Sequence, residues 1–403
     1  MNVLKFFLWG NLMLLAFSGF AINYIPDPDL MLMQLTLDQK IGQLMVVAAV
    51  SDPAMNAEFM QEAVHTMDVQ SIKKLITDYH VGGVIFLGMS ELEKQFALTQ
   101  DFQQLSAIPL LVCMDFEWGL TMRLRDAMMF PRNDVLGLLS PLQDDLIYQM
   151  GYEIGKQCKA LGVHLNLAPV VDVNNNPKNP VINSRSFGAD KELVAHKAIL
   201  YMQGLQDAGI MACAKHFPGH GDTDVDSHYD LARITHARER LDDIEFFPFK
   251  KLIKAGCMAI MIAHLEVSAL EPREYLPTSL SHAVVTALLK DEFDFKGLII
   301  TDSLGMVGVT KYHQPGELEL EALQAGNDIL LCPVDVPKAV AIIKQAISQG
   351  RFSEQELDKR VLKVLKFKAW AKSGSMPEAF DRKKFFSYDA QVLQQKLYAH
   401  AIA

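Results

Sequence analysis

The feature that most constrains the fold is a series of apolar runs, each bounded by Gly, Pro or Asp. The runs are almost continuously apolar, which is typical of parallel strands that are covered on both faces. Between them lie segments of helical periodicity, such as 71–80, 146–162 and 281–293. The alternation predicts an α/β fold, a closed (β/α)8 barrel of the TIM type. Its strands are expected at residues 43–49, 82–88, 109–115, 163–173, 209–216, 258–264, 296–302 and 327–333.

An open, doubly wound sheet is the alternative arrangement of such repeats. That fold places a glycine-rich phosphate-binding turn after its first strand. The sequence contains neither GxGxxG nor GxxxxGK[ST]. The closed barrel is therefore favoured.

Composition and charge exclude several classes of partner. The chain has 403 residues, of which 50% are hydrophobic and 21% charged, as in large globular proteins. The formal net charge is −10 and no block of Lys or Arg stands out, which argues against nucleic acid and against binding to anionic lipid. The five cysteines show no CxxC spacing, so we expect buried free thiols and no disulfide framework.

The two ends of the chain differ from the barrel. Residues 1–21 contain an early lysine, an apolar run and small residues at Gly19 and Ala21, which predicts a signal peptide cleaved after Ala21. A periplasmic or secreted protein is expected, or a membrane-anchored one if the segment stays uncleaved, with no other membrane domain. The barrel is expected as a single domain over 24–371. Residues 372–403 have no strand run and are expected to form a short C-terminal tail, a linker and a surface helix.

Ionisable side chains stand where most of the predicted strands end. In a barrel of this type the carboxyl ends of the strands meet at one mouth. Ionisable groups beside apolar strands are costly unless they are paired or functional. The sequence therefore predicts a site at this mouth, built from Asp115 and Glu117 after the third run, Asp172 after the fourth, Lys215 and His216 after the fifth, His264 after the sixth and Asp302 after the seventh.

The stretch AKHFPGHGDTDVDSH, residues 214–228, leaves the fifth strand as a loop, because its proline and glycines exclude a regular helix. Asp226 and His228 are two residues apart, so the carboxylate can orient the imidazole, which then exchanges protons near neutral pH. Asp302, at a rigid strand end, is a good mount for a nucleophile. A carboxylate nucleophile and a separate acid/base are the catalytic residues that a glycoside hydrolase needs.

Other interpretations of this loop are weaker. A metal site would use His216 and His220, but HFPGH cannot place them on one face of a helix. The aspartates match only the first half of a calcium loop, since Ser227 and Arg233 stand where its glycine and final glutamate should be. A merely solvated acidic turn would leave Lys215 and His216 unexplained. No metal and no organic cofactor is expected.

The same loop resembles the signature of glycoside hydrolase family 3, in its β-N-acetylhexosaminidase branch. Three more segments are similar to that family in the family's order: MDFEWGLTMRL (114–124), NLAPVVDVNNNPKNPVINSRSFG (166–188) and LIITDSLGM (298–306). The resemblance extends from about residue 37 to residue 369. Trp118 departs from it, because the family more often has glycine there.

The resemblance implies a (β/α)8 catalytic domain and a retaining mechanism through a covalent glycosyl-enzyme. It places the nucleophile at Asp302, the acid/base at His228 and the partner of that histidine at Asp226. Glu117, Asp172, His220 and His264 are expected to support the pocket rather than to react. The side chains that would grip the sugar hydroxyls are Asp115, Arg123, Arg185, Lys215 and His216.

The predicted function is an exo-β-N-acetylhexosaminidase that removes terminal β-linked N-acetylglucosamine from a glycan or muropeptide of peptidoglycan. A phosphorylase or a β-glucosidase on the same scaffold stays open, as do a non-catalytic sugar-binding protein of the envelope and, last, a metal-dependent hydrolase. QQKLYAHAIA (394–403) resembles the helix that opens a further domain in longer relatives. A shortened form is therefore expected, with an apolar helix face open to a protein partner.

Overall fold

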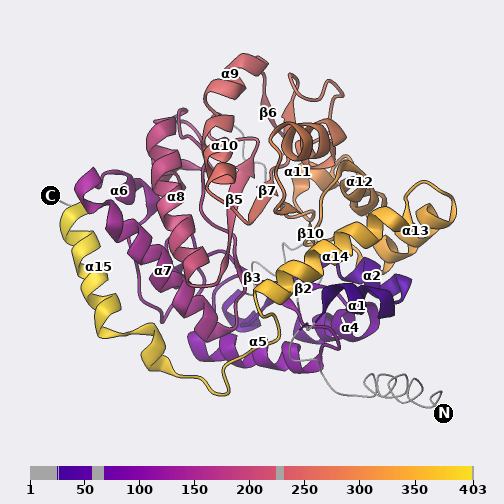
Figure 1. Ribbon diagram of the computed structural model, residues 1–403, viewed down its shortest axis with the longest axis horizontal. Helices are drawn as coiled ribbons and strands as arrows, with labels where there is room; N and C mark the ends of the chain where they lie inside the picture. The colour runs from indigo at the N-terminus through magenta and orange to yellow at the C-terminus, as the bar shows by residue number, and fades with distance from the viewer. Residues whose placement is uncertain (1–24, 26, 57–67, 224–230, 402–403) are drawn as a thin grey trace, which may run out of the picture.

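The computed structural model describes residues 25, 27–56, 68–223 and 231–401. Parallel strands form one sheet in the order β10-β1-β2-β3-β4-β5-β7-β9 (Figure 1). Its two edges meet at a parallel bridge between Ile300 and Ile329, and the Thr301 N–H donates to the Ile329 carbonyl at 3.1 Å. The predicted (β/α)8 barrel is confirmed. Its strands are β1 (Met45–Val50), β2 (Gly83–Leu87), β3 (Leu111–Met114), β4 (Leu165–Asn166), β5 (Met211–Phe217), β7 (Ala259–Ile262), β9 (Leu298–Thr301) and β10 (Leu330–Leu331).

Each of these strands lies within a predicted run or overlaps it, but β4 and β10 are much shorter than predicted. After Asn166 the ladder of β4 breaks because Pro169 has no N–H to donate. A single bridge between Val170 and Lys215 continues toward β5. Strand β10 ends where Cys332 leaves the extended conformation, with a φ of 50°. Short pairing at these positions frees the following residues for the mouth of the barrel.

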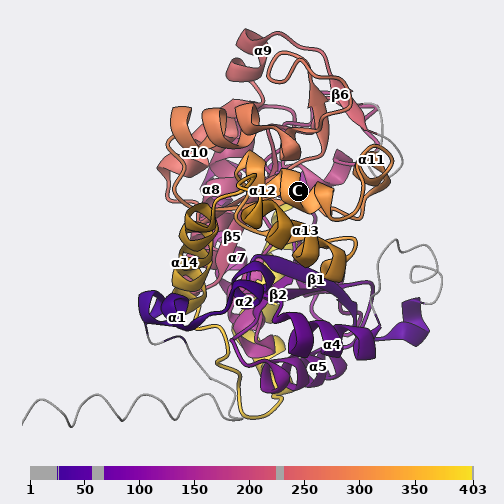
Figure 2. The same ribbon diagram turned by 90° about the vertical axis from the view of Figure 1, so that its right-hand side faces the viewer.

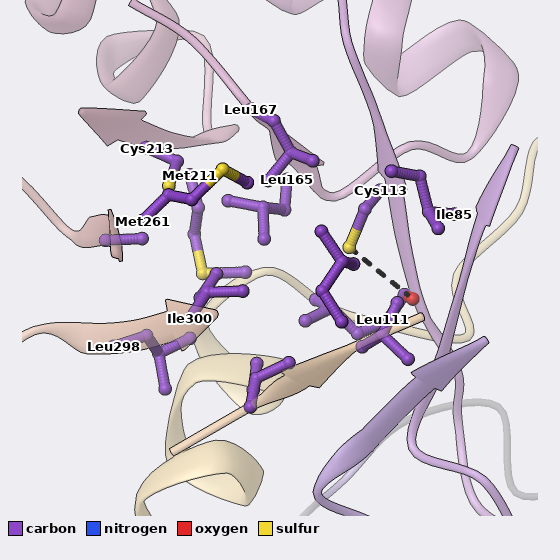
Figure 3. Packing of buried hydrophobic residues seen from close by; sticks show 14 of the residues in the cluster. Ile85, Leu111, Cys113, Leu165, Leu167, Met211, Cys213, Met261, Leu298 and Ile300 are labelled. Atoms are coloured by element: carbon purple, nitrogen blue, oxygen red, sulfur yellow. Dashed lines mark hydrogen bonds between the residues drawn. The ribbon is translucent and has the colours of Figure 1, made fainter. Parts of the chain in front are cut away.

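The interior of the barrel is filled by side chains from alternate strand positions. Figure 3 shows Leu111 and Cys113 of β3, Met211 and Cys213 of β5, and residues of β2, β4, β7 and β9 turned toward a common centre. Residues two apart share one face of a strand, so both members of each pair point inward. The barrel centre is therefore a packed apolar core and not a channel.

Helices surround the sheet, and α1, α2, α4 and α5 lie on the side opposite α9 and α10 (Figures 1 and 2). The three predicted helices correspond to α4, α7 and the π-helix η6 (Ala283–Glu292). The described α-helices are α1 (Pro28–Gln34), α2 (Leu37–Gly42), α4 (Val69–Tyr79), α5 (Leu92–Leu105), α6 (Asn133–Gly137), α7 (Asp144–Leu161), α8 (Lys191–Asp207), α9 (Arg238–Asp243), α10 (Phe246–Lys254), α11 (Val307–Thr310), α12 (Glu317–Ala325), α13 (Val336–Ser348), α14 (Glu354–Trp370) and α15 (Tyr388–Ala401). Short 3₁₀ turns lie at Pro53–Asn56, Leu120–Met122, Pro141–Gln143, Asn183–Arg185, Thr278–Leu280 and Arg382–Phe385.

Helices α7 and α8 pack against each other unusually closely. A Cβ atom on Gly151 of α7 would lie 2.3 Å from the Tyr201 carbonyl oxygen of α8. A Cβ on Gly204 of α8 would lie 2.2 Å from the Tyr148 carbonyl oxygen of α7. Only glycine permits this approach. It fixes the backbone of α8 against α7 at Tyr201.

A second sheet was not predicted. Strands β6 (Ala232–Ile234) and β8 (Leu265–Val267) pair in parallel, with Arg233 opposite Glu266. Three residues with a polar centre are too short to stand out as an apolar run. Because β8 begins directly after His264, this pair lies beside the mouth of the barrel.

The C-terminal segment packs on the barrel. Helix α15 lies along α7 and α6 (Figure 1). Its apolar residues Ala390, Leu393 and Leu397 are buried, whereas Tyr388 is exposed. An apolar face open to a protein partner is thus not supported, because the apolar side chains of this helix already pack on its own barrel.

All five cysteines are free and buried, as expected. Burial raises the pKa of each thiol, for example that of Cys257 to about 11. In the part of the chain that the structure describes, no helix is both long and apolar enough to cross a membrane.

Lys368 of α14 gives the barrel a pH-dependent stability. It is fully buried and its Nζ donates to Oε1 of Gln43 at 2.6 Å. Burial lowers its pKa to about 7. The unfolded chain, with a pKa near 10.5 for this lysine, binds more protons between these values, so the free energy of unfolding should rise with pH across that window. We expect a rise of about 2 kcal/mol between pH 7 and 9 from this group.

The substitution Lys368→Met should remove that rise. Urea unfolding of both proteins at pH 7 and pH 9 measures it, and the difference between them isolates Lys368 from other titrating groups. An identical pH dependence in both proteins would show that Lys368 titrates normally.

Candidate active site

The structure brings the predicted sugar-binding residues together at the carboxyl ends of the strands. Asp115 follows β3, Lys215 and His216 lie in β5, and Arg123 and Arg185 come from the long loops after β3 and β4. Ion pairs and hydrogen bonds join these side chains with Glu117 and Asp172 into one network.

An irregularity in β5 explains how two consecutive residues serve this network. The register between β5 and β7 shifts between Ala214 and Phe217. In a regular strand neighbouring side chains point to opposite faces, and a bulge redirects one of them. Lys215 can therefore contact Asp115 and Glu117 while His216 contacts Asp172.

Lys215 lies between two carboxylates. Its Nζ is 2.9 Å from Oδ1 of Asp115 and 2.8 Å from Oε1 of Glu117. Arg123 donates from Nη2 to Oδ2 of Asp115 at 2.7 Å. Arg185 grips Glu117 with two hydrogen bonds, of 3.0 Å from Nε and 2.7 Å from Nη2. Three cations thus surround two anions, a geometry that fixes every member.

The network stays charged across neutral pH. Burial would raise the pKa of Glu117, but Arg185 and Lys215 outweigh burial and hold it at about 2. In the same way, Lys215 and Arg123 outweigh burial and hold the pKa of Asp115 well below its usual range. Burial would lower the pKa of Lys215, and the two carboxylates raise it instead. A ligand therefore meets fixed charges.

Exposure separates the residues that can touch a ligand from those that support them. The side chains of Asp115, Arg123 and Arg185 are 13%, 24% and 21% exposed. Those of Lys215 and Glu117 are 3% and 0% exposed. The first three are available to bind sugar hydroxyls with strong, directional hydrogen bonds, whereas Glu117 organises the two cations beside it.

His216 is oriented by Asp172, which is buried. Nδ1 of His216 lies 2.7 Å from Oδ2 of Asp172, and the backbone N–H groups of His216 and His220 also donate to this carboxylate. Nη2 of Arg185 is 3.3 Å from Nε2 of His216. A guanidinium can only donate, so Nε2 accepts and Nδ1 carries the proton. Burial would raise the pKa of Asp172, but His216 lowers it.

The start of the predicted acid/base loop is anchored by Asn179, a residue that the sequence did not single out. Its Nδ2 donates to the carbonyls of His220 and Gly221 at 2.8 and 3.0 Å. Oγ1 of Thr223 lies 2.9 Å from Nδ1 of His220. The predicted acid/base His228 and its partner Asp226 lie outside the described residues.

Asp302 stands on the end of β9, as predicted. Its N–H donates to the Ile262 carbonyl at 2.8 Å, which extends the ladder with β7, and its Oδ1 accepts from the Ser303 N–H at 2.7 Å. The carboxylate is partly exposed. Its charge favours the protonated forms of His264 and His220. Burial and then His216 outweigh this effect at His220 and lower its pKa to about 4. Asp302 therefore has a rigid backbone and an accessible carboxylate.

His264 supports this backbone. Its Nε2 lies 2.9 Å from the Ser303 carbonyl oxygen and its Nδ1 lies 2.7 Å from Oγ of Ser279. A carbonyl only accepts, so Nε2 carries the proton. Burial lowers the pKa of His264, which keeps this arrangement at neutral pH. The side chain fixes the Ser303–Leu304 peptide, one residue beyond Asp302.

The histidines do not form a metal site with their described neighbours. The rings of His216 and His220 are 6.0 Å apart, and their Nδ1 atoms are bonded to Asp172 and Thr223. Within the described ranges, no three His, Cys, Asp or Glu side chains are placed to share a metal ion.

Trp118 lies beside the network and is partly covered. The guanidinium of Arg132 stacks over its ring at 5.1 Å, and Nη1 of Arg132 donates to Oγ of Ser184 at 3.3 Å. One face of the indole is therefore occupied by a cation.

Comparisons with known proteins agree with this architecture. Residues 36–367 match the glycosyl hydrolase family 3 N-terminal domain. Beta-hexosaminidase A of Pseudoalteromonas piscicida is 31% identical over 326 residues, and the match covers 74% of this chain. It covers 54% of that protein, so the chain spans about half of the relative's length.

Two further matches have comparable identity and cover more of the similar protein. Beta-hexosaminidase LpqI of Mycobacterium tuberculosis is 31% identical over 309 residues, covering 75% of this chain and 79% of that protein. The structure of a family 3 beta-N-acetylglucosaminidase from Paenibacillus sp. superimposes with a TM-score of 0.80 at 34% identity, covering 91% of this chain and 69% of that one. The chain belongs to glycosyl hydrolase family 3 and contains that family's N-terminal barrel domain.

Proposed function

We propose that this chain is a retaining exo-β-N-acetylhexosaminidase that releases terminal β-linked N-acetylglucosamine. The observation that carries the proposal is the pairing of an accessible carboxylate with a fixed hydroxyl-binding network at one barrel mouth. Asp302 follows β9 and Asp115 follows β3, so both stand at carboxyl ends of strands of the same barrel. The names of the relatives, two β-hexosaminidases and a β-N-acetylglucosaminidase, support the acetamido sugar as substrate.

In the proposed mechanism Asp302 attacks the anomeric carbon as the glycosidic bond breaks. His228, oriented by Asp226, protonates the departing oxygen. His228 then removes a proton from water, which attacks the same carbon and releases Asp302, with retained configuration. The described part of this loop, as far as Thr223, is anchored by Asn179 and by the contact between His220 and Thr223.

The bound sugar is held by the network. Asp115 accepts hydrogen bonds from hydroxyls, and Arg123 and Arg185 donate to hydroxyl oxygens. His216 contacts Arg185 through Nε2 and, together with Glu117, holds the guanidinium in place. Because these partners are fixed before the sugar arrives, little ordering is needed on binding.

The natural substrate that we propose is a peptidoglycan fragment in the periplasm. The support is the sequence of residues 1–21, which has the pattern of an export signal. Peptidoglycan contains β-linked N-acetylglucosamine outside the cytoplasmic membrane, so an exported hexosaminidase would have access to it.

The first experiment compares an aryl β-N-acetylglucosaminide with the matched β-glucoside, in chelator and without phosphate. Faster release from the acetamido sugar is expected. A preference for the glucoside would contradict the proposed substrate, and turnover only with added phosphate would indicate a phosphorylase. Binding of N-acetylglucosamine without any turnover would indicate a non-catalytic sugar-binding protein.

A further inference from the structure

The peptide groups of Phe116 are held by side chains and not by a neighbouring strand. Phe116 lies two residues beyond Met114, where β3 ends. Its N–H donates to Oδ1 of Asn166 at 3.0 Å, and its carbonyl accepts from Nδ2 of Asn166 at 3.3 Å and from the Tyr201 hydroxyl at 2.7 Å. The Gly119 N–H, in the turn that follows, also donates to this carbonyl at 3.2 Å. Phe116, Asn166 and Tyr201 are completely buried. We call these contacts the Phe116 clamp.

In the Phe116 clamp, side-chain hydrogen bonds replace the strand pairing that ends at Met114 and Asn166. Met114 and Asn166 are the last paired residues of β3 and β4. The side-chain amide of Asn166 presents a carbonyl oxygen and an N–H to the Phe116 backbone, as a strand peptide would, and Nδ2 also donates to the Tyr201 hydroxyl at 3.3 Å. The Tyr201 hydroxyl, from α8, is a further side-chain donor to the carbonyl. A rotation of either peptide group of Phe116 would leave buried polar groups unpaired, which is costly.

The residues on either side of Phe116 are Asp115 and Glu117. Both carboxylates reach the single ammonium of Lys215, at 2.9 and 2.8 Å. Asp115 also holds Arg123, and Glu117 holds Arg185. The backbone conformation of one residue, Phe116, therefore sets the distance between two carboxylates and, through them, the positions of three cations.

We propose that Asn166 and Tyr201 are positioning residues for sugar binding: through the Phe116 clamp they hold Asp115 and Glu117 in the spacing that the sugar-binding network requires. The inference rests on the proposed function, because it assigns these two residues to the sugar site of that enzyme. Neither residue is in a position to contact the sugar, since both are completely buried.

The same strand offers a matched control at its other end. Nε2 of Gln103 donates to the Leu110 carbonyl at 2.8 Å, and the Leu110 N–H donates to Oε1 of Gln103 at 3.0 Å. This is the same reciprocal amide contact, on the residue just before β3, at the pole opposite the mouth. Gln103 is also buried. A substitution of Gln103 should lower the free energy of unfolding about as much as a substitution of Asn166, but it should not weaken sugar binding.

The experiment compares Asn166→Asp with Gln103→Glu in the full chain. Each change keeps the acceptor for the backbone N–H and removes the donor to the carbonyl. We expect Asn166→Asp to weaken binding of N-acetylglucosamine, measured by calorimetry, about tenfold and to raise KM for the aryl N-acetylglucosaminide similarly. Gln103→Glu should leave both values within about twofold. Loss of folded protein would lower kcat per total protein without changing KM.

A milder variant covers the case in which Asn166→Asp does not fold. Tyr201→Phe removes one donor to the Phe116 carbonyl and keeps the ring. It should raise the dissociation constant about threefold, and hydrogen exchange of the 114–118 segment should become faster than in wild type. Unchanged affinity and unchanged exchange in Tyr201→Phe would overturn the proposal.

Failure of the proposed function would appear differently. If wild type binds N-acetylglucosamine without hydrolysing it, the proposed hydrolase fails, whereas the affinity of the variants still tests the Phe116 clamp. If wild type hydrolyses the substrate and Asn166→Asp folds with unchanged KM, the proposed function stands and the positioning role is wrong.

Discussion

Replacing Asp302 by alanine is expected to lower kcat on the aryl N-acetylglucosaminide by about 10⁴-fold or more. The carboxylate supplies the electron pair that forms the glycosyl-enzyme, and no neighbouring described carboxylate stands in the same place on the end of β9. Binding of N-acetylglucosamine should change only a few-fold, since the network around Lys215 is intact. Steady-state kinetics together with calorimetry separate the two effects.

Asp335 provides a control for Asp302. It follows β10, and its side chain caps α13 by accepting the Lys338 N–H. Asp335→Ala should cost about 1 kcal/mol of stability and leave kcat unchanged. An equal loss of kcat in both variants would mean that Asp302 acts through stability.

A covalent label identifies the nucleophile independently of mutation. A 5-fluoro-N-acetylglucosaminyl fluoride should accumulate as an ester on Asp302. The ring fluorine slows both formation and breakdown of the glycosyl-enzyme, and the good fluoride leaving group restores the rate of formation alone. Peptide mapping by mass spectrometry locates the adduct. An adduct on any other carboxylate would contradict the assignment.

The second large effect is expected for Lys215→Met, which should lower kcat/KM by about 10²–10³-fold and the free energy of unfolding by about 3–5 kcal/mol. The change removes the cation between Asp115 and Glu117 and leaves both carboxylates in a buried site. Arg123 keeps Asp115 and Arg185 keeps Glu117, but the ammonium that binds both carboxylates is lost and the Phe116 backbone alone must then hold their spacing.

The pH dependence of this loss tests its electrostatic origin. In wild type the pKa of Glu117 is held at about 2, below its ordinary 4.5, so its ionised form contributes stability above pH 4.5 that is lost as pH falls toward 2. Without Lys215, burial should raise this pKa. The stability deficit of Lys215→Met should therefore be larger at pH 7 than at pH 4, measured by urea unfolding at both values.

Lys363→Met is the matched control for Lys215→Met. Nζ of Lys363 lies 2.7 Å from Oδ2 of Asp328, a buried carboxylate at the opposite pole of the barrel. Its removal should cost stability but leave kcat/KM unchanged. If Lys363→Met reduced activity as strongly as Lys215→Met, the loss would reflect the barrel in general and not the site.

Strand periodicity was sufficient to predict the barrel, because each core strand is an apolar run. It failed for β6 and β8, whose centres are the polar Arg233 and Glu266. It also overestimated β4, since apolar residues continue past Pro169 although the ladder does not. Periodicity records which residues are buried, and hydrogen-bond donors decide where pairing stops.

Which residues gather at the mouth of the barrel could also be predicted in part from the sequence. Strand ends meet at one mouth, so Asp115, Lys215 and Asp302 had to be neighbours. The partners within the network were not predictable, because they depend on loop paths and on the bulge in β5. Asn166 did leave a signal: an asparagine inside the run VHLNLAPVVDV is a buried amide that needs partners.

Closure of the sheet has a consequence for synthesis of the chain. The last core strand, β10, pairs with the first, β1, at Met45–Leu330 and Val46–Leu331. At about 5–20 residues per second, tens of seconds separate the appearance of these strands. Until then the nascent chain presents an unpaired sheet edge at β1, an apolar template for other strands. The growing polypeptide is thus expected to depend on chaperones that cover β1 until β10 emerges.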